Sequence, residues 1–237
     1  MSSGIYVATA GAVAQSNALD ATANNIANAA TAGFHGDRVT FREALTAARS
    51  PDVATVGAGT TRIDGQAGAL TATENPLDLA LDGDGYFAVG TPAGPRYTRA
   101  GNFQLDDQHR LVTADGFAVR GEGGAPITIP PEAREVAVAA DGTVSADGAA
   151  LGKLELVRFA PAQVVREGGS LVSATGRPLA GDPPKVRSGM LEASNVNVVR
   201  GVVDLVKVSR TYESLMRVIQ GYHDVESRAA RELGAPK

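Results

Sequence analysis

The chain of 237 residues contains no cysteine and no tryptophan, and aromatic residues make up only 5% of it. Without cysteine there can be no disulfide, no thiolate metal ligand and no cysteine nucleophile. No apolar run reaches the roughly 18 to 20 residues that a transmembrane helix needs. The net charge of −4 also lacks the basic excess that nucleic acids and anionic membranes attract. We therefore expect neither nucleic-acid binding nor membrane insertion.

The N-terminal segment is short of charge. Its first acidic residue is Asp20 and its first basic residue is Arg38. A cleavable secretory signal carries basic residues ahead of its apolar core, and this segment has none. We expect that, if the protein leaves the cytoplasm, this segment stays attached.

Sequence patterns typical of catalysis and metal binding are also missing. His35, His109 and His223 lie on three different segments, and neither H-x-x-x-H nor H-E-x-x-H occurs. The run 82–85 (D-G-D-G) is similar to the start of a calcium loop but lacks the later ligands and the final Glu. No G-x-S-x-G elbow and no phosphate-binding loop is present. We expect no enzyme, no metal and no cofactor.

What the N-terminal end does contain is a helical pattern. Residues 3–30 include no proline, and apolar side chains recur every seven positions, at Ile5, Ala12, Leu19 and Ile26. This spacing predicts an amphipathic helix with a narrow apolar seam. Gly33 is the expected C-terminal cap, because glycine tolerates a left-handed backbone.

The C-terminal end, residues 195–232, repeats the pattern. Its seam is formed by Val198, Leu205, Tyr212 and Ile219, with Val202 and Met216 on an adjoining stripe. Ser194 or Asn195 is the expected N-cap. Two matching seams favour pairing of the helices with each other and leave apolar surface for neighbouring subunits. The alternative is that both helices pack on the central part of the chain.

Between about residues 60 and 187, short β-type runs alternate with Asp-Gly turns, at 82–85, 115–116 and 141–142. Asp-Gly is a strong hairpin signal. The predicted fold class is α+β, with two terminal α-helices forming a coiled-coil-like inner domain and a central, mainly antiparallel β domain. The expected divisions are a helical domain at 1–33 and 190–237, a junction segment at 34–75, and a β-rich outer domain at 76–189.

Three segments resemble the signatures of the flagellar rod, hook and basal-body protein family. They are 23–34 (A-N-N-I-A-N-A-A-T-A-G-F), 75–89 (N-P-L-D-L-A-L-D-G-D-G-Y-F-A-V), and 189–196 (G-M-L-E-A-S-N-V) followed by 209–213 (S-R-T-Y-E). They occur in the family's order and span nearly the whole chain. The modest length is similar to that of rod proteins rather than hook proteins, with a proximal rod protein favoured over a distal one. His35 and Arg200 depart from the family pattern, which often has Lys and Glu there.

The resemblance implies a structural rod subunit that assembles helically with other proximal and distal rod proteins. The assembled rod would enclose an export channel and transmit torque. It would belong to the flagellar basal body and span the periplasm. It implies export by the flagellar type III apparatus without a cleaved signal, and terminal segments that are poorly ordered before assembly. Ring proteins are further candidate partners. The expected subunit contacts are Ile5, Ala12, Leu19, Asn24, Asn25, Ile26, Asn28, Val198, Val202, Leu205, Tyr212, Met216 and Ile219, and the expected junction residues are Thr31, Gly33 and Phe34.

Two questions stay open from the sequence. The three asparagines are poor interior helix formers, so they either make hydrogen bonds between subunits or form a solvated face near a fraying helix end. The second question concerns function: the chain could instead be a free cell-envelope module that grips peptidoglycan through its β domain.

Overall fold

The structure is a computed structural model that describes residues 3–45 and 54–234. Its chain forms two compact units. The helical unit takes its described residues from 1–27, 37–62 and 197–237, and the β unit consists of 28–36 and 63–196. The predicted α+β class is confirmed: the two terminal helices pack together, and the sheets between them in sequence are antiparallel.

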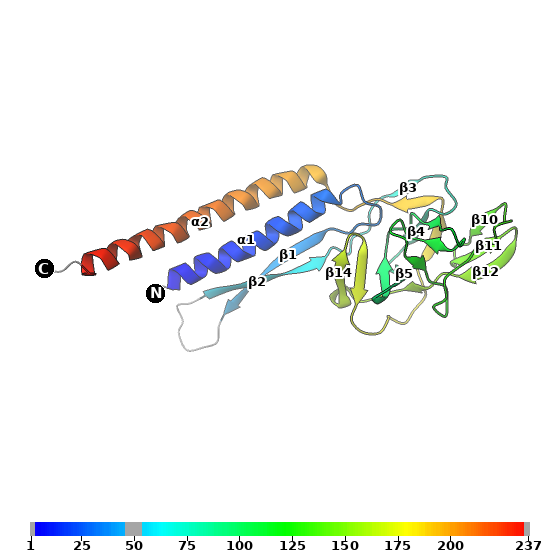
Figure 1. The fold of residues 1–237 in the computed structure, drawn as a ribbon, viewed down its shortest axis with the longest axis horizontal. Coiled ribbons are helices and arrows are strands. Elements are labelled where there is room, and N and C mark those ends of the chain that lie inside the picture. The colour runs from blue at the N-terminus through cyan, green and yellow to red at the C-terminus, as the bar shows by residue number, and fades with distance from the viewer. Residues whose placement is uncertain (1–2, 46–53, 235–237) are drawn as a thin grey trace. The chain divides into compact units, whose positions relative to one another are not determined.

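The helical unit contains α1 (Ser3–Ala27) and α2 (Val198–Gly234), which lie side by side in Figure 1. It also contains β1 (Asp37–Leu45) and β2 (Ala54–Ile63), which form a two-stranded sheet, and β1 packs against α1. Both strands lie largely in the segment expected to be a junction, 34–75, where the sequence pattern does not predict them.

Both predicted helix caps were wrong. The N-cap of α2 is Asn197, whose side-chain oxygen accepts a hydrogen bond from the backbone N–H of Arg200 at 3.0 Å. Helix α1 ends at Ala27, six residues before Gly33. Gly33 does have a positive φ of 63°, but its role is close packing, because a Cβ there would lie 2.2 Å from the carbonyl carbon of Arg99.

The β unit is built from short strands. Its largest sheet runs in the order β14-β15-β6-β5-β9-β8-β7, and β13 also pairs with β5. Smaller sheets are β10-β11-β12, β16-β4 and β17-β3. The bounds are β3 (Leu70–Ala72), β4 (Leu79–Asp82), β5 (Tyr86–Thr91), β6 (Gly94–Thr98), β7 (Gln104–Leu105), β8 (Leu111–Val112), β9 (Ala118–Val119), β10 (Val136–Val138), β11 (Thr143–Ala146), β12 (Ala149–Lys153), β13 (Leu156–Val157), β14 (Val164–Gly168), β15 (Leu171–Ala174), β16 (Lys185–Ser188) and β17 (Met190–Glu192), with a 3-10 turn at Pro161–Gln163.

Two of the three predicted Asp-Gly hairpins are confirmed. Val112 pairs with Ala118 across the turn at 115–116, and Val138 pairs with Val144 across the turn at 141–142. The turn at 82–85 closes no hairpin, because β4 pairs with β16 while β5 pairs with β6, β9 and β13. That turn therefore connects two different sheets.

The core of the β unit is aliphatic with two phenylalanines. Phe87 and Phe103 meet edge to face, with ring centroids 5.1 Å apart. The other buried members are Leu79, Leu81, Val89, Leu111, Val119, Ile127, Val138, Val144, Leu154 and Val186. A chain with few aromatic residues thus fills its interior mainly with branched aliphatic side chains.

Candidate functional site

The contact between α1 and α2 depends on glycines. Large side chains of one helix lie against glycines of the other: Tyr222 on Gly4, Leu215 on Gly11, and Ile26 on Gly201. An added Cβ at these glycines would come within 2.5, 3.4 and 2.9 Å of the facing side chain, respectively. The order of these contacts shows that the helices are antiparallel, and the missing side chains let the two helices approach closely.

The predicted seams lie partly in this contact. On α1, the buried residues are all alanines: Ala8, Ala12, Ala14 and Ala18. Ile5, Leu19 and Ile26 are half-buried. On α2, the half-buried residues Gly201, Leu205, Val208, Tyr212, Leu215 and Ile219 alternate in steps of four and three, which is the spacing of one helix face.

Other apolar residues of α2 are exposed. Val199 is 76% and Val203 is 63% exposed, and Val198, Val202 and Val206 are also exposed. We call these five residues the valine face. Val199, Val202, Val203 and Val206 follow the i, i+3, i+4, i+7 spacing of a single helix surface, turned away from the stripe that meets α1. Met216, further along the helix, is exposed as well.

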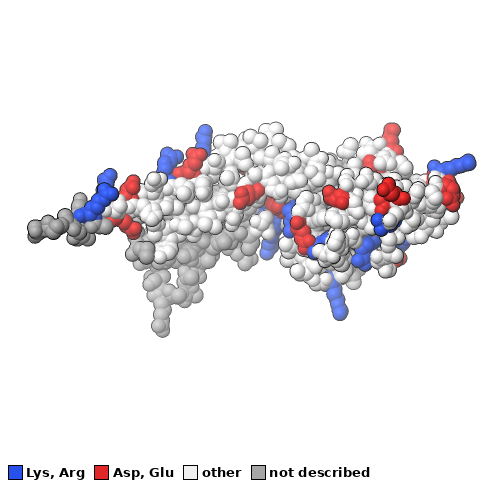
Figure 2. Space-filling view, in the orientation of Figure 1, with Lys and Arg blue, Asp and Glu red and all other residues white. Residues whose placement is uncertain are grey.

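The space-filling view agrees with this distribution. On the face shown in Figure 2, charged side chains gather over the C-terminal half of α2, whereas the surface around its start is largely uncharged. An uncharged, apolar helix surface of this kind is typical of a protein contact.

The asparagines predicted to bond between subunits have partners within the chain. The Asn25 amide pairs with the backbone of Asp37, donating to its carbonyl at 2.8 Å and accepting from its N–H at 2.7 Å. Asn24 donates to the Asp37 carboxylate at 3.5 Å. Asn28 accepts from the Thr31 hydroxyl at 3.3 Å. Asn24 and Asn25 thereby attach α1 to the start of β1, and hydrogen bonds between subunits stay a prediction.

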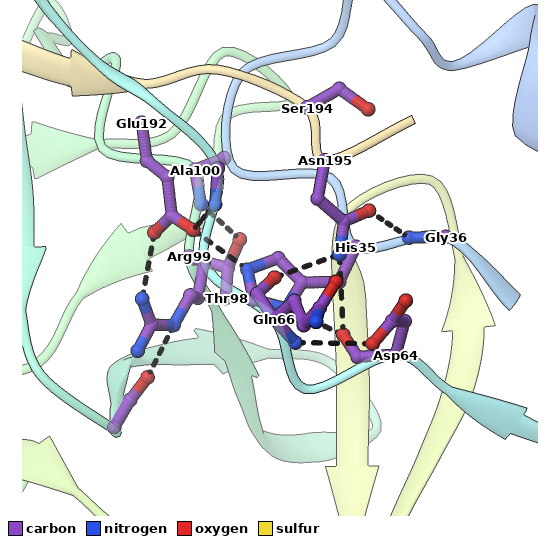
Figure 3. Close-up of polar contacts among 12 residues, drawn as sticks. His35, Gly36, Asp64, Gln66, Thr98, Arg99, Ala100, Glu192, Ser194 and Asn195 are labelled. Carbon is purple, nitrogen blue, oxygen red and sulfur yellow. Dashed lines mark hydrogen bonds and ion pairs between the residues drawn. The ribbon is translucent and has the colours of Figure 1, made fainter. Parts of the chain in front are cut away.

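The predicted junction residues Gly33 and Phe34 bond through their backbone to residues of a buried polar cluster in the β unit. Figure 3 shows the polar contacts of this cluster. The carboxylate of Glu192 is its centre. That carboxylate accepts from Nε2 of His35 at 2.8 Å, from Nη1 of Arg99 at 2.7 Å and from the backbone N–H of Gly68 at 2.8 Å. The Glu192 carbonyl accepts from the Gly33 N–H at 2.7 Å.

The rest of this cluster fixes the neighbouring backbone. Asn195 accepts from the Gly36 N–H at 2.8 Å and donates to the Gln66 carbonyl at 2.7 Å. Arg99 also donates to the carbonyls of Gly85, at 2.9 Å, and of Gly83. We call residues 33–36, 64–68, Arg99 and 192–195 the Glu192 cluster.

The electrostatics of the cluster keep Glu192 charged. Burial raises the pKa of the Glu192 carboxyl, but the hydrogen bond from His35, the charge and hydrogen bond of Arg99, and the Gly68 N–H together outweigh burial and leave that pKa below its ordinary value. The carboxylate is 1% and Arg99 is 5% exposed. Both charges are thus buried but neutralised by each other and by hydrogen bonds.

Comparison with protein families accounts for most of the chain. Residues 5–35 match the family described as "Flagella basal body rod protein". Residues 80–146 match "Flagellar hook protein FlgE/F/G D1 domain", and residues 187–232 match "Flagellar basal body rod FlgEFG protein C-terminal". Individual relatives are similar over nearly their whole length. The rod protein FlgF of Salmonella typhimurium is 37% identical, with 97% of each chain covered.

The chain belongs to the flagellar basal-body rod protein family.

Further relatives support this membership. The FlgF protein of Rhizobium meliloti is 32% identical over the full length of both chains. The basal-body rod protein FlgG of Bacillus subtilis is 35% identical, covering 85% of this chain and 88% of its own. The chain is therefore a structural protein of the basal-body rod and not an enzyme. This also favours the rod subunit over the free envelope module. Family membership implies assembly with other rod proteins.

The Glu192 cluster of this rod protein was missed by the sequence analysis. Glu192 and Asn195 lie in the quoted segment 189–196, but their partners in the cluster are about 90 to 160 residues away in the chain. A Glu placed directly between Leu191 and Ala193 was the available signal, because a carboxylate among apolar residues needs a partner if it is buried.

Two further observations concern the residues that the structure describes. No helix among them has the length and apolarity needed to cross a membrane. Nor do they include a group of three or more His, Asp or Glu side chains placed to hold a metal ion.

Proposed function

We propose that the valine face of α2 is a subunit contact through which this rod protein assembles with neighbouring rod proteins. The observation that carries the proposal is the exposure of five valines on a helix whose opposite side is covered by α1. Covering such a surface is favourable because it removes apolar area from water. Val198 and Val202, which the sequence analysis assigned to subunit contacts, belong to this face.

The contact suits a helical assembly. Contacts between different surfaces of identical or related subunits are head-to-tail, and they generate open helices where the rotation between subunits does not close a ring. We propose that such an assembly of proximal and distal rod proteins encloses the export channel and transmits torque, with ring proteins as further partners.

We further propose a proximal position in the rod and export by the type III apparatus without a cleaved signal. The relatives named FlgF support the proximal position, because they are 32% to 37% identical over 97% or more of both chains. FlgG proteins are similar too. Membership in the basal-body rod family supports this export route.

Charge placed on the valine face tests the contact. We expect Val203→Asp to prevent incorporation into the rod, because an unpaired carboxylate would be buried at the contact. The purified variant should keep the far-ultraviolet circular dichroism of the parent, since Val203 is exposed in the subunit. Incorporation is measured by the amount of the chain in purified basal bodies, together with motility.

Val165→Asp is the matched control. Val165 is 53% exposed on β14 in the β unit, so the same change there should leave incorporation intact. Leu205→Asp differs from both, because it places the charge on the half-buried stripe of α2 and should disturb helix pairing as well. Normal rod assembly by Val203→Asp would exclude the valine face as a contact.

A further inference from the structure

His35 is the member of the Glu192 cluster whose chemistry is unusual. Its side chain is 7% exposed, and each of its two ring nitrogens faces an oxygen (Figure 3). Nδ1 lies 3.0 Å from the backbone carbonyl oxygen of Asp64, and Nε2 lies 2.8 Å from Oε1 of Glu192. A neutral imidazole can donate from only one nitrogen, whereas the imidazolium donates from both.

Neither oxygen can supply the hydrogen. A backbone carbonyl only accepts hydrogen bonds. The Glu192 carboxylate already accepts from Arg99 and from the Gly68 N–H, and its pKa is held below the ordinary value, so it is ionised at neutral pH. Both ring nitrogens must therefore donate. A neutral ring would leave one nitrogen lone pair directed at an oxygen in a buried site, which is repulsive and leaves an acceptor unsatisfied.

We propose that His35 is held as the imidazolium and acts as a pH-sensitive latch, which joins residues 33–36 to residues 64–68 and 192–195 while the ring is doubly protonated. The latch is a property of the β unit alone. It does not depend on the valine face or on rod assembly.

The charged groups around the ring are consistent with one bound proton. Glu192 supplies the negative charge, and Arg99 shares it through the other carboxylate oxygen. Arg166 of β14 donates to the His35 carbonyl, and its guanidinium lies 4.3 Å from the centre of the Phe34 ring. The cavity of about 230 Å³ beside the ring is also lined by Asp84, Tyr86 and Arg158, and the remaining acid nearby is Asp64.

The joined segments are those by which the chain leaves the β unit. It continues from residue 36 into β1, re-enters at residue 63 after β2, and leaves after residue 196 into α2. Besides the ring, three backbone bonds join these segments: Gly33 N–H to the Glu192 carbonyl at 2.7 Å, Asp64 N–H to the Gly36 carbonyl at 2.7 Å, and Asn195 N–H to the Phe34 carbonyl at 3.2 Å. The Asn195 side chain adds bonds to Gly36 and Gln66. Loss of the ring proton should loosen this region without unfolding the sheets.

The direction of the pH effect follows from proton binding. A histidine in an unfolded chain loses its charge near pH 6.5. Because both ring nitrogens face acceptor oxygens in the folded site, the fold favours the doubly protonated ring, so the stabilisation is present at low pH and is lost as the pH rises and the ring gives up a proton. One proton changes the unfolding equilibrium by up to about tenfold per pH unit within that range.

The ring itself provides the first test. The ¹⁵N chemical shifts of His35 in the full-length chain should show both nitrogens protonated at pH 7. A shift pattern of one protonated and one bare nitrogen at pH 7 would overturn the proposal. This measurement uses the unaltered protein, so it does not depend on whether a variant folds.

A variant series provides the second test. His35→Gln, whose side chain is neutral, should be less stable to urea than the parent at pH 6, and this difference should shrink as the pH rises to 9. The ratio of the two unfolding constants should change by up to about tenfold for each pH unit. His35→Lys, which keeps a cation, should follow a flatter profile over the same range. His223→Gln is the control, because His223 is exposed on α2. A deficit of His35→Gln that is independent of pH would contradict the latch.

Discussion

At the scale of single residues, the structure shows how a buried carboxylate is tolerated. Glu192 lies in β17 and is almost inaccessible, yet each of its oxygens has a donor. Breaking such a pair is far more costly than removing a surface pair, because it leaves the other charge buried without a partner. Glu192 is therefore the residue of the β unit at which a change of charge should matter most.

Glu192→Gln should lower the free energy of unfolding of the β unit by about 3 to 5 kcal/mol at pH 7, because Arg99 would keep its buried charge without a counter-ion. Urea unfolding followed by near-ultraviolet circular dichroism measures this change. The control is Glu122→Gln, which breaks the exposed pair with Lys153 and should cost less than about 1 kcal/mol.

Glu192→Gln should also change how the stability of the β unit depends on acidic pH. Because the folded pKa of Glu192 lies below its unfolded value near 4.3, its charge stabilises the fold above that pH. The stabilisation is lost as the pH falls through the lower, folded pKa. Asp106, Asp141 and Glu167, whose pKa values are also lowered, act in the same direction. Stability curves of Glu192→Gln and the parent that run parallel from pH 7 to pH 3 would contradict this assignment.

Two residues singled out by their sequence pattern, Gly33 and Asn195, have other roles in the structure than those predicted. Gly33 was predicted as a helix cap and does adopt a positive φ. Glycine is needed there, however, because a side chain would clash with the backbone of Arg99. Asn195 was predicted as a cap and instead bonds to Gly36 and Gln66. In both cases the decisive partner is distant in sequence, and local propensity contains no information about it.

At the scale of elements, periodicity predicted more. Both terminal helices were expected from seven-residue repeats, because a repeat of that length is visible within the element itself. The turn at 82–85 was misread since the partner of β4 is β16, about 100 residues further on. The strands β1 and β2 were also missed, within a segment assigned to the junction.

The glycines of α2 offer a test of the helix contact. An alanine at either Gly221 or Gly201 gains up to about 1 kcal/mol in helix propensity. At Gly221 an added Cβ meets nothing within 4 Å, so Gly221→Ala should raise stability. At Gly201 the Cβ would lie 2.9 Å from Cγ1 of Ile26, so Gly201→Ala should give no gain or a loss.

Thermal unfolding followed at 222 nm compares the two variants directly, and each serves as the control of the other. Equal stabilisation by both alanines would show that Ile26 and Gly201 are not in contact.

At the scale of the whole molecule, the two units differ in how they satisfy their apolar residues. The β unit has an aliphatic core of its own. The helical unit buries mostly alanines on α1 and leaves valines of α2 exposed. Most helix stability comes from packing rather than from propensity. The helices should therefore be the less stable part of the isolated protein.

The isolated chain should accordingly show less helix by circular dichroism than α1 and α2 together would give, and the helical signal should rise when rod partners are added. The β unit should remain folded at temperatures at which the helical signal has been lost. A monomer with the full helical signal and a single unfolding transition for both units would contradict ordering on assembly.

The two helices differ in length, with 25 residues in α1 and 37 in α2. Tyr222 of α2 lies against Gly4, near the start of α1. Beyond Tyr222, α2 continues for roughly 12 more residues, or about 18 Å, with no residue of α1 beside it (Figure 1). The helical pair thus ends in a step rather than a flush face. A stepped end can overlap lengthwise with a helix of the next subunit, and a lengthwise overlap resists twisting and shear, which an end-on contact resists poorly.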